Sequence, residues 1–202
     1  TRYIGDWSSD VCSSDLQSMG ARIVSVPAGP DYAFPLDGML RAITPNTRLV
    51  YVNNPNNPSG QPIAKEAIRR VAREAGHALV FVDEAYQDFL GENFLDEAAT
   101  YPNVLIGRTF SKAFGLAGMR VGVMIASPAV LAPIRKVMPL FNLNVVAVAA
   151  LRAAIADPSF RSWYMAQAAE SKALIYAACE RAGLKYWKSA ANFVLVEIGR
   201  AH

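Results

Sequence analysis

The sequence predicts an α/β protein, in which a mostly parallel sheet is flanked by helices and followed by the start of a smaller α+β unit. Three observations support this prediction. Short apolar runs rich in Val, Ile and Leu recur along the first two thirds of the chain, an amphipathic helical pattern lies between two of them, and polar residues follow three of the runs directly. Strand-like and helix-like segments joined by short links are typical of α/β layered domains.

The apolar runs give the expected strands. They lie at residues 22–26, 48–52, 79–82, 104–106 and 121–125. The second run is apolar enough to be covered on both faces, as strands of parallel sheets are. Helices are expected at 36–43 and 64–75, because their apolar residues recur at helical spacing. The second helix places Ile68, Val71 and Ala72 on one face and most of its charged residues on the other.

The last third of the chain is mainly helical. We expect helices at 129–137 and 145–156 and a long helix from Asp157 and Pro158 to about Arg181, with Gly183 as its stop. Short strands are expected at 184–187 and 193–196. We therefore place a domain boundary near Pro158, with a large domain at 17–157 and the beginning of a small domain at 158–196.

The two ends of the chain differ from the rest. Residues 7–15 show neither helical nor strand periodicity, and 1–16 resemble translated sequencing-adapter sequence. Residues 197–202 look similar. We expect both segments to be non-native and to lie outside the fold, and we expect the natural protein to be longer at both ends.

Composition excludes several classes of protein. The 202 residues are 52% hydrophobic and 18% charged, with a formal charge of +3 and no basic stripe, so a nucleic-acid partner is disfavoured. Apolar runs fall short of the roughly 18 residues that a membrane helix needs. The two cysteines, Cys12 and Cys179, predict reduced thiols in the cytoplasm. The two histidines, His77 and His202, are too isolated for a metal site.

Polar side chains follow three of the expected strands. Asn57 comes after the second strand, Asp83 after the third and Lys112 after the fourth, with Tyr86 close behind Asp83. In open α/β sheets the ligand lies beyond the carboxyl ends of the strands, so parallel strands would bring these groups to one crevice. Each also has an ordinary explanation: Asp83 as a helix cap, Asn57 as a turn residue and Tyr86 as a core aromatic.

This set of groups matches the chemistry of pyridoxal 5′-phosphate (PLP). A carboxylate such as Asp83 keeps the ring nitrogen protonated, and the ring then acts as an electron sink. Asn57 and Tyr86 are candidate donors to the 3′-oxygen. Lys112 could form a Schiff base with the aldehyde and, once freed, carry a proton between the substrate and the cofactor.

The loop at 108–122 offers contacts for the phosphate. Ser111 and Arg120 could hold it by hydrogen bond and by charge, with Thr109 as a second hydroxyl. The alternative is a surface loop in which Lys112 and Arg120 are simply solvated.

These motifs resemble the fold-type I, class I and II aminotransferases, and within them the histidinol-phosphate aminotransferases. The resemblance rests on Asn54–Gly60, Asp83–Tyr86, Arg108–Gly118 with Arg120, and Ser189–Val196, and it extends over about residues 17–196. It implies that Lys112 is the Schiff-base lysine and Asp83 the partner of the ring nitrogen. It also implies the 3′-oxygen contacts Asn57 and Tyr86, and the phosphate contacts Ser111 and Arg120.

The resemblance further implies a homodimeric transaminase that moves an amino group between an amino donor and a 2-oxo acid acceptor. The family's N-terminal phosphate-binding turn, its stacking aromatic residue and its carboxylate-binding arginine have no counterpart in this sequence. We therefore expect the chain to carry about half of an active site. Two alternatives stay open: another fold-type I enzyme, such as a threonine-phosphate decarboxylase, or a non-catalytic PLP-binding regulator module.

Overall fold

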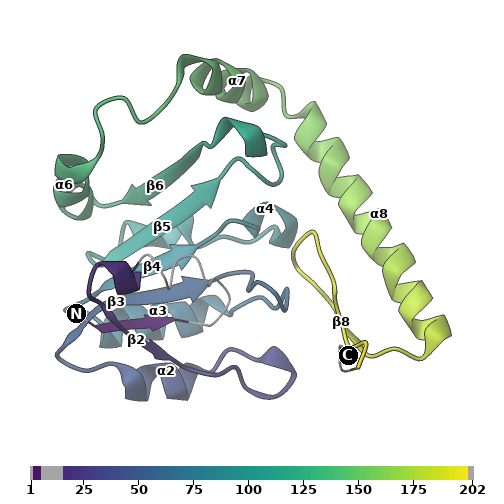
Figure 1. The fold of residues 1–202 in the computed structure, drawn as a ribbon, viewed down its shortest axis with the longest axis horizontal. Helices are drawn as coiled ribbons and strands as arrows, with labels where there is room; N and C mark the ends of the chain where they lie inside the picture. The colour runs from purple at the N-terminus through teal and green to yellow at the C-terminus, as the bar shows by residue number, and fades with distance from the viewer. Residues whose placement is uncertain (1, 6–15, 200–202) are drawn as a thin grey trace.

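The structure is a computed structural model that describes residues 2–5 and 16–199. Its centre is a six-stranded sheet in the order β2-β1-β3-β4-β5-β6, and β7 with β8 form a separate two-stranded sheet (Figure 1). The strands of the large sheet are β1 (Arg2–Gly5), β2 (Arg22–Ser25), β3 (Thr47–Asn53), β4 (Leu79–Asp83), β5 (Val104–Thr109) and β6 (Gly122–Ala126). β1 to β5 pair in parallel, and β6 runs antiparallel to β5. The predicted fold class, α/β with a mostly parallel sheet, is confirmed.

Strand β1 corrects one expectation. It comes from the segment 1–16, which we expected to lie outside the fold, yet it pairs with both β2 and β3 inside the sheet. Leaving Arg2–Gly5 out of the fold was therefore wrong, because a pattern judged on residues 7–15 says nothing about the four residues at 2–5. Residues 6–15 and 200–202 lie outside the described part of the chain, and the foreign origin of the two ends stays a prediction.

Helices cover one face of the large sheet. They are α2 (Leu36–Ala42), α3 (Lys65–Glu74) and the short helix α5 (Leu95–Ala98). A further short helix, α4 (Gln87–Leu90), lies at the carboxyl end of β4, and neither α4 nor α5 was predicted. The main core lies between this layer and the sheet: Met39, Ile68, Val71 and Ala98 pack against alternate strand residues. Those strand residues are Val50, Val52, Val80, Val82, Val104 and Ile106, all at most 1% exposed. Because successive side chains of a strand point to opposite faces of the sheet, Tyr51, Phe81 and Asp83 point away from this core.

The second half forms an arc of helices that runs from the carboxyl end of β6, past the β6 edge of the sheet, to its opposite end (Figure 1). These are α6 (Pro128–Val137), α7 (Val145–Ala156) and the long α8 (Ser159–Ala182), which lies beyond the carboxyl ends of β3 to β5 (Figure 1). Gly183 ends α8 in the left-handed conformation at φ 64°, as expected of a C-terminal glycine. β7 (Tyr186–Trp187) and β8 (Leu195–Val196) follow and pair antiparallel. The predicted domain boundary near Pro158 stays a prediction.

Candidate active site

The carboxyl ends of the three central strands meet at one edge of the sheet. In the register of the sheet Asn53 lies beside Asp83, and Asp83 lies beside Gly107. The loops that follow β3, β4 and β5 therefore leave the sheet side by side. β6 begins at this same edge, because Gly122 pairs with Thr109. The expectation that the three strand ends share one edge is confirmed, and all seven predicted site residues lie on it or on the loops next to it.

Asp83 is held rigidly by two donors. The hydroxyl of Tyr51 donates to Oδ2, and the backbone N–H of Ala85 donates to Oδ1 at 3.0 Å. Tyr51 is only 4% exposed and pairs in register with Phe81, two residues before Asp83 on the neighbouring strand. The two side chains therefore share a face and reach each other diagonally. Sequence reasoning missed Tyr51, although a tyrosine two positions before a strand end on the face of a carboxylate was a usable signal.

Asn57, Tyr86 and Lys112 come together although they are far apart in the sequence. The side-chain amide of Asn57 donates to the phenol oxygen of Tyr86 at 3.3 Å. The ammonium nitrogen of Lys112 lies 5.2 Å from the centre of the Tyr86 ring, within the range of a cation–π contact. Tyr86 is 9% exposed, so the ring sits in a fixed environment. The cluster presents an amide, a phenol and an amine at the sheet edge.

Residues 109–121, which carry Lys112 from the end of β5 to the start of β6 and are called the lysine loop below, are shaped by their own hydrogen bonds. The hydroxyl of Thr109 accepts from the backbone N–H of Ser111 at 3.1 Å, and the carbonyl of Lys112 accepts from Gly115, which has φ 68°. Arg120 follows the turn η2 (Ala117–Met119) and adopts the left-handed conformation at φ 55°. Its guanidinium donates to the Ala117 carbonyl at 3.0 Å. Among the described residues no hydrogen bond joins Arg120 to Ser111, and their shared contact with a phosphate stays a prediction.

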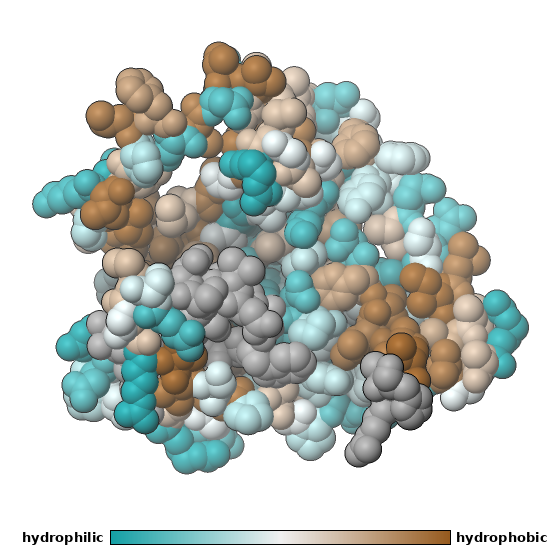
Figure 2. All heavy atoms as spheres, viewed as in Figure 1, coloured by the Kyte–Doolittle hydropathy of each residue, from teal (hydrophilic) through white to brown (hydrophobic). Residues whose placement is uncertain are grey.

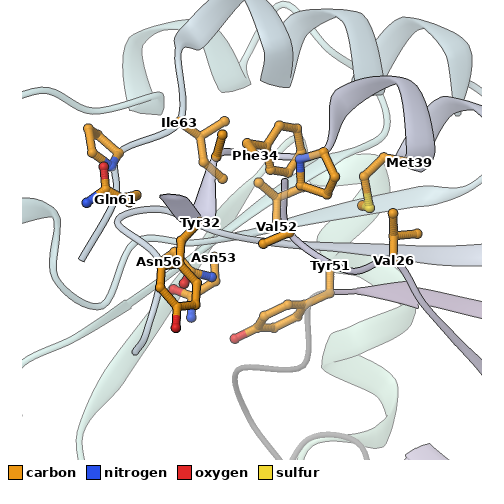
Figure 3. Close-up of a pocket in the computed structure, with 14 residues that line it drawn as sticks. Val26, Tyr32, Phe34, Met39, Tyr51, Val52, Asn53, Asn56, Gln61 and Ile63 are labelled. Carbon is orange, nitrogen blue, oxygen red and sulfur yellow. The ribbon is translucent and has the colours of Figure 1, made fainter. Parts of the chain in front are cut away.

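Two cavities lie near these residues, and their sizes decide which one suits a cofactor. The larger has about 600 Å³ and is lined by Asp83, Ala85 and Thr109 together with Arg108 and Arg135. That volume is in the range of small-molecule sites. The second, drawn in Figure 3, is lined by Tyr32, Asn53, Asn56 and Gln61 together with apolar side chains such as Phe34 and Met39, and has about 10 Å³ of free space. It has room for roughly one water molecule.

The donor set fits PLP. Asp83 lines the larger cavity, and Arg135 adds positive charge to its wall, whereas Asn57, Tyr86 and Lys112 lie outside its lining. Such a wall suits a phosphorylated, anionic molecule. Among residues 2–5 and 16–199, no cluster of three or more His, Cys, Asp or Glu side chains could hold a metal ion. No helix in the same residues is long and apolar enough to cross a membrane.

Glu84 forms a buried ion pair that sequence reasoning did not predict. Its side chain is 0% exposed, and Oε2 accepts from Nε and Nη2 of Arg108 at 2.9 and 2.7 Å. Oε1 accepts from the backbone N–H of Phe94 at 2.6 Å. Adjacent carboxylates thus point to opposite sides of the sheet, Asp83 toward the cavity and Glu84 into the protein. The pair ties the loop after β4 to β5 immediately beside the lysine loop.

The chain belongs to the class I and II aminotransferase family, whose model matches residues 3–202. It is 46% identical over 192 residues to histidinol-phosphate aminotransferase 2 of Ralstonia nicotianae, covering 91% of this chain and 50% of that protein. It is 38% identical over 199 residues to histidinol-phosphate aminotransferase 1 of Cupriavidus pinatubonensis, with 96% and 53% covered. The chain therefore spans about half the length of the curated relatives it matches.

Solved structures agree with this assignment. The histidinol-phosphate aminotransferase of Sinorhizobium meliloti in complex with pyridoxal-5′-phosphate superposes with a TM-score of 0.92 at 30% identity, covering 99% of this chain and 56% of that one. The L-threonine-O-3-phosphate decarboxylase of Porphyromonas gingivalis superposes with a TM-score of 0.81 at 20% identity, with 97% and 59% covered. At that identity the likeness shows the fold alone.

Proposed function

We propose that the protein acts as a PLP-dependent aminotransferase on an amino-phosphate substrate of the histidinol-phosphate type, with a 2-oxo acid as acceptor. The observation that carries this proposal is the convergence of Lys112, Tyr86 and Asn57 on the edge that also holds Asp83. The curated relatives named as histidinol-phosphate aminotransferases support the substrate class. The decarboxylase alternative has only a shared fold in its favour.

Each proposed site residue has a role in the reaction that follows from the chemistry of its side chain. When bound, PLP supplies the electron sink that stabilises negative charge at the α-carbon of the substrate. Asp83, which is fixed by hydrogen bonds from Tyr51 and Ala85, would keep the ring nitrogen of PLP protonated. Lys112 would hold the cofactor through its amine and, when that amine is free, would move a proton at the substrate carbon.

Asn57 and Tyr86 would hold the 3′-oxygen of PLP by hydrogen bonds. The phenol oxygen of Tyr86 already accepts a hydrogen bond from Asn57, so its own proton is free to point at another acceptor. We assign the phosphate to Thr109, Ser111 and Arg120, because their hydroxyl and guanidinium groups are the donors on the lysine loop. Thr109 also lines the larger cavity.

The test is covalent trapping. The 202-residue chain is incubated with PLP, reduced with borohydride and mapped by peptide mass spectrometry. We expect the pyridoxyl group on Lys112, and a Lys112→Arg variant should lose this label. Lys185, which is 57% exposed and outside the site, serves as the matched control position. Label distributed over surface lysines without preference for Lys112 contradicts the proposal.

We further propose that the parent protein is a homodimer in the cytoplasm. Large apolar side chains are exposed in the segment joining α6 to α7, where Leu140 is 92% and Phe141 is 96% exposed (Figure 2). Exposed apolar patches of this kind drive association. The buried, unpaired thiol of Cys179 supports a reducing compartment. Sedimentation at micromolar concentration should show self-association that Phe141→Ser weakens and Met19→Ser, 83% exposed elsewhere, leaves unchanged. A stable monomer contradicts the dimer.

A further inference from the structure

Residues 188–193, which form most of the loop between β7 and β8, have no role in the cofactor assignments above. Most of them belong to the segment Ser189–Val196, one of the motifs that carry the family resemblance. In Figure 1 this part of the chain lies between α8 and the carboxyl edge of the large sheet.

The loop is joined tightly to the loop that carries Asn57. The N–H of Ala190 donates to the carbonyl of Gly60 at 2.8 Å, and the side-chain amide of Gln61 donates to the carbonyl of Lys188 at 2.9 Å. Gly60 has φ 70°, and a Cβ at this position would lie 2.1 Å from Oγ of Ser189. Only glycine therefore allows the two loops to approach so closely.

The same loop also holds Tyr86. The ring of Phe193 meets the Tyr86 ring edge to face, with centroids 5.1 Å apart and planes at 88°. This geometry is the favourable one for an aromatic pair. Because the Tyr86 ring contacts both Phe193 and the amine of Lys112, it has little freedom to move. Its hydroxyl therefore stays next to the Asn57 amide.

Helix α8 holds the loop through hydrogen bonds of three of its side chains. The phenol oxygen of Tyr176 accepts from the N–H of Ser189 at 2.9 Å, and the amine of Lys172 donates to the Ser189 carbonyl at 2.7 Å. The side-chain amide of Asn192 donates to the phenol oxygen of Tyr164 at 3.2 Å. Burial lowers the pKa of Lys172, which agrees with an amine committed to an internal contact. The loop is therefore a rigid part built against α8.

We propose that the 188–193 loop positions Asn57 and Tyr86 for the 3′-oxygen of PLP, with Phe193 as the positioning residue for the Tyr86 ring. This inference rests on the proposed function, since it assigns a purpose to the orientation of two proposed cofactor contacts. If Phe193 had only a structural role, its loss would change the stability of the chain alone. A positioning role predicts that its loss also changes the spectroscopic behaviour of the bound cofactor.

The experiment compares Phe193→Leu with Trp187→Leu in the 202-residue chain. Trp187 is a matched control, because its ring also makes an edge-to-face contact that joins the C-terminal strand pair to the large domain. The partner ring is Tyr32, with centroids 4.9 Å apart, and Tyr32 is not a proposed site residue. PLP binding is followed by the visible absorbance band, by its pH titration and by borohydride trapping at Lys112. Phe193→Tyr, which keeps the aromatic edge, tests for rescue.

We expect Phe193→Leu to weaken PLP binding about three- to ten-fold, the range of one aromatic pair. Donors to the 3′-oxygen favour its ionised form, so disturbing them should raise the pH midpoint of the absorbance change by about half a unit. Phe193→Tyr should restore both values, and Trp187→Leu should match the wild type. Equal behaviour of Phe193→Leu and Trp187→Leu overturns the inference.

The outcomes separate the two proposals. A wild-type chain without label at Lys112 refutes the proposed function and the inference with it, whereas a labelled wild type with an unaffected Phe193→Leu refutes the inference alone. If Phe193→Leu does not fold, Gln61→Ala replaces it, because that change removes only the exposed bond to the Lys188 carbonyl. About two-fold weaker PLP binding is then expected, and unchanged binding and titration overturn the inference.

Discussion

Replacing Glu84 should destabilise the protein far more than replacing an exposed glutamate in the same kind of ion pair. The Glu84 side chain is 0% exposed and binds Arg108, which is 26% exposed, as well as the N–H of Phe94. Removing one partner of a buried pair costs about 3–5 kcal/mol, because the other charge is left uncompensated. Glu84→Gln keeps an acceptor for Phe94, and water reaches part of Arg108, so we expect a loss of about 2–3 kcal/mol.

The pair can be isolated by a double-mutant cycle. Arg108→Met leaves the buried carboxylate without its cation and should cost about 3–5 kcal/mol. Combining it with Glu84→Gln should cost about 1–3 kcal/mol less than the sum of the two single changes, since residues in direct contact are not additive. The free energy of unfolding is measured by urea denaturation, with the slope checked for a constant value.

Glu66 provides the matched control. It pairs with Arg73 at 2.7 Å, but the two side chains are 64% and 57% exposed. Exposed pairs contribute under about 1 kcal/mol, so Glu66→Gln should change stability little. If Glu84→Gln and Glu66→Gln gave equal losses, burial would not govern the Glu84 pair, and the reasoning would be refuted.

Three other changes test the same physical account. Arg69 holds the pKa of the Glu97 carboxyl below its usual value, so the stabilisation by this pair is fully present above about pH 4.5 and is lost as the pH falls through the lowered pKa. Glu97→Gln should cost about 1 kcal/mol at pH 7 and progressively less as the pH falls below about 4.5, and a pH-independent loss counts against this account. Tyr51→Phe removes a charge-assisted bond to Asp83 and should cost about 1.5–3 kcal/mol by thermal unfolding, whereas an unchanged midpoint would show that the bond contributes nothing. Asn103→Ala removes the amide that donates to the carbonyls of Ala72, Ala75 and Ala78 at 2.9–3.1 Å, in and just after α3, and a loss of about 1–3 kcal/mol in urea is expected; wild-type stability would mean that water replaces the amide.

Local sequence determined the elements of this protein. Runs of β-branched residues gave the strands because strand backbones favour them, and apolar spacing gave α3, whose Ile68 and Val71 are fully buried. Polar residues after buried strands indicated where Asn57, Asp83 and Lys112 would meet, since parallel strands bring their carboxyl ends to one edge. The motifs on those loops also indicated the family. All of this information lies within short stretches of chain.

Tertiary structure decided what depends on residues distant in sequence. The hydrogen bond from Tyr51 to Asp83 and the burial of Glu84 against Arg108 follow from strand register, which no single segment contains. The placement of β1 between β2 and β3 likewise depends on pairing partners and not on a pattern within Arg2–Gly5. The contact of Phe193 with Tyr86 exists only because α8 carries the chain back to the sheet edge. Local patterns specify segments, whereas the packing of segments against each other creates the site.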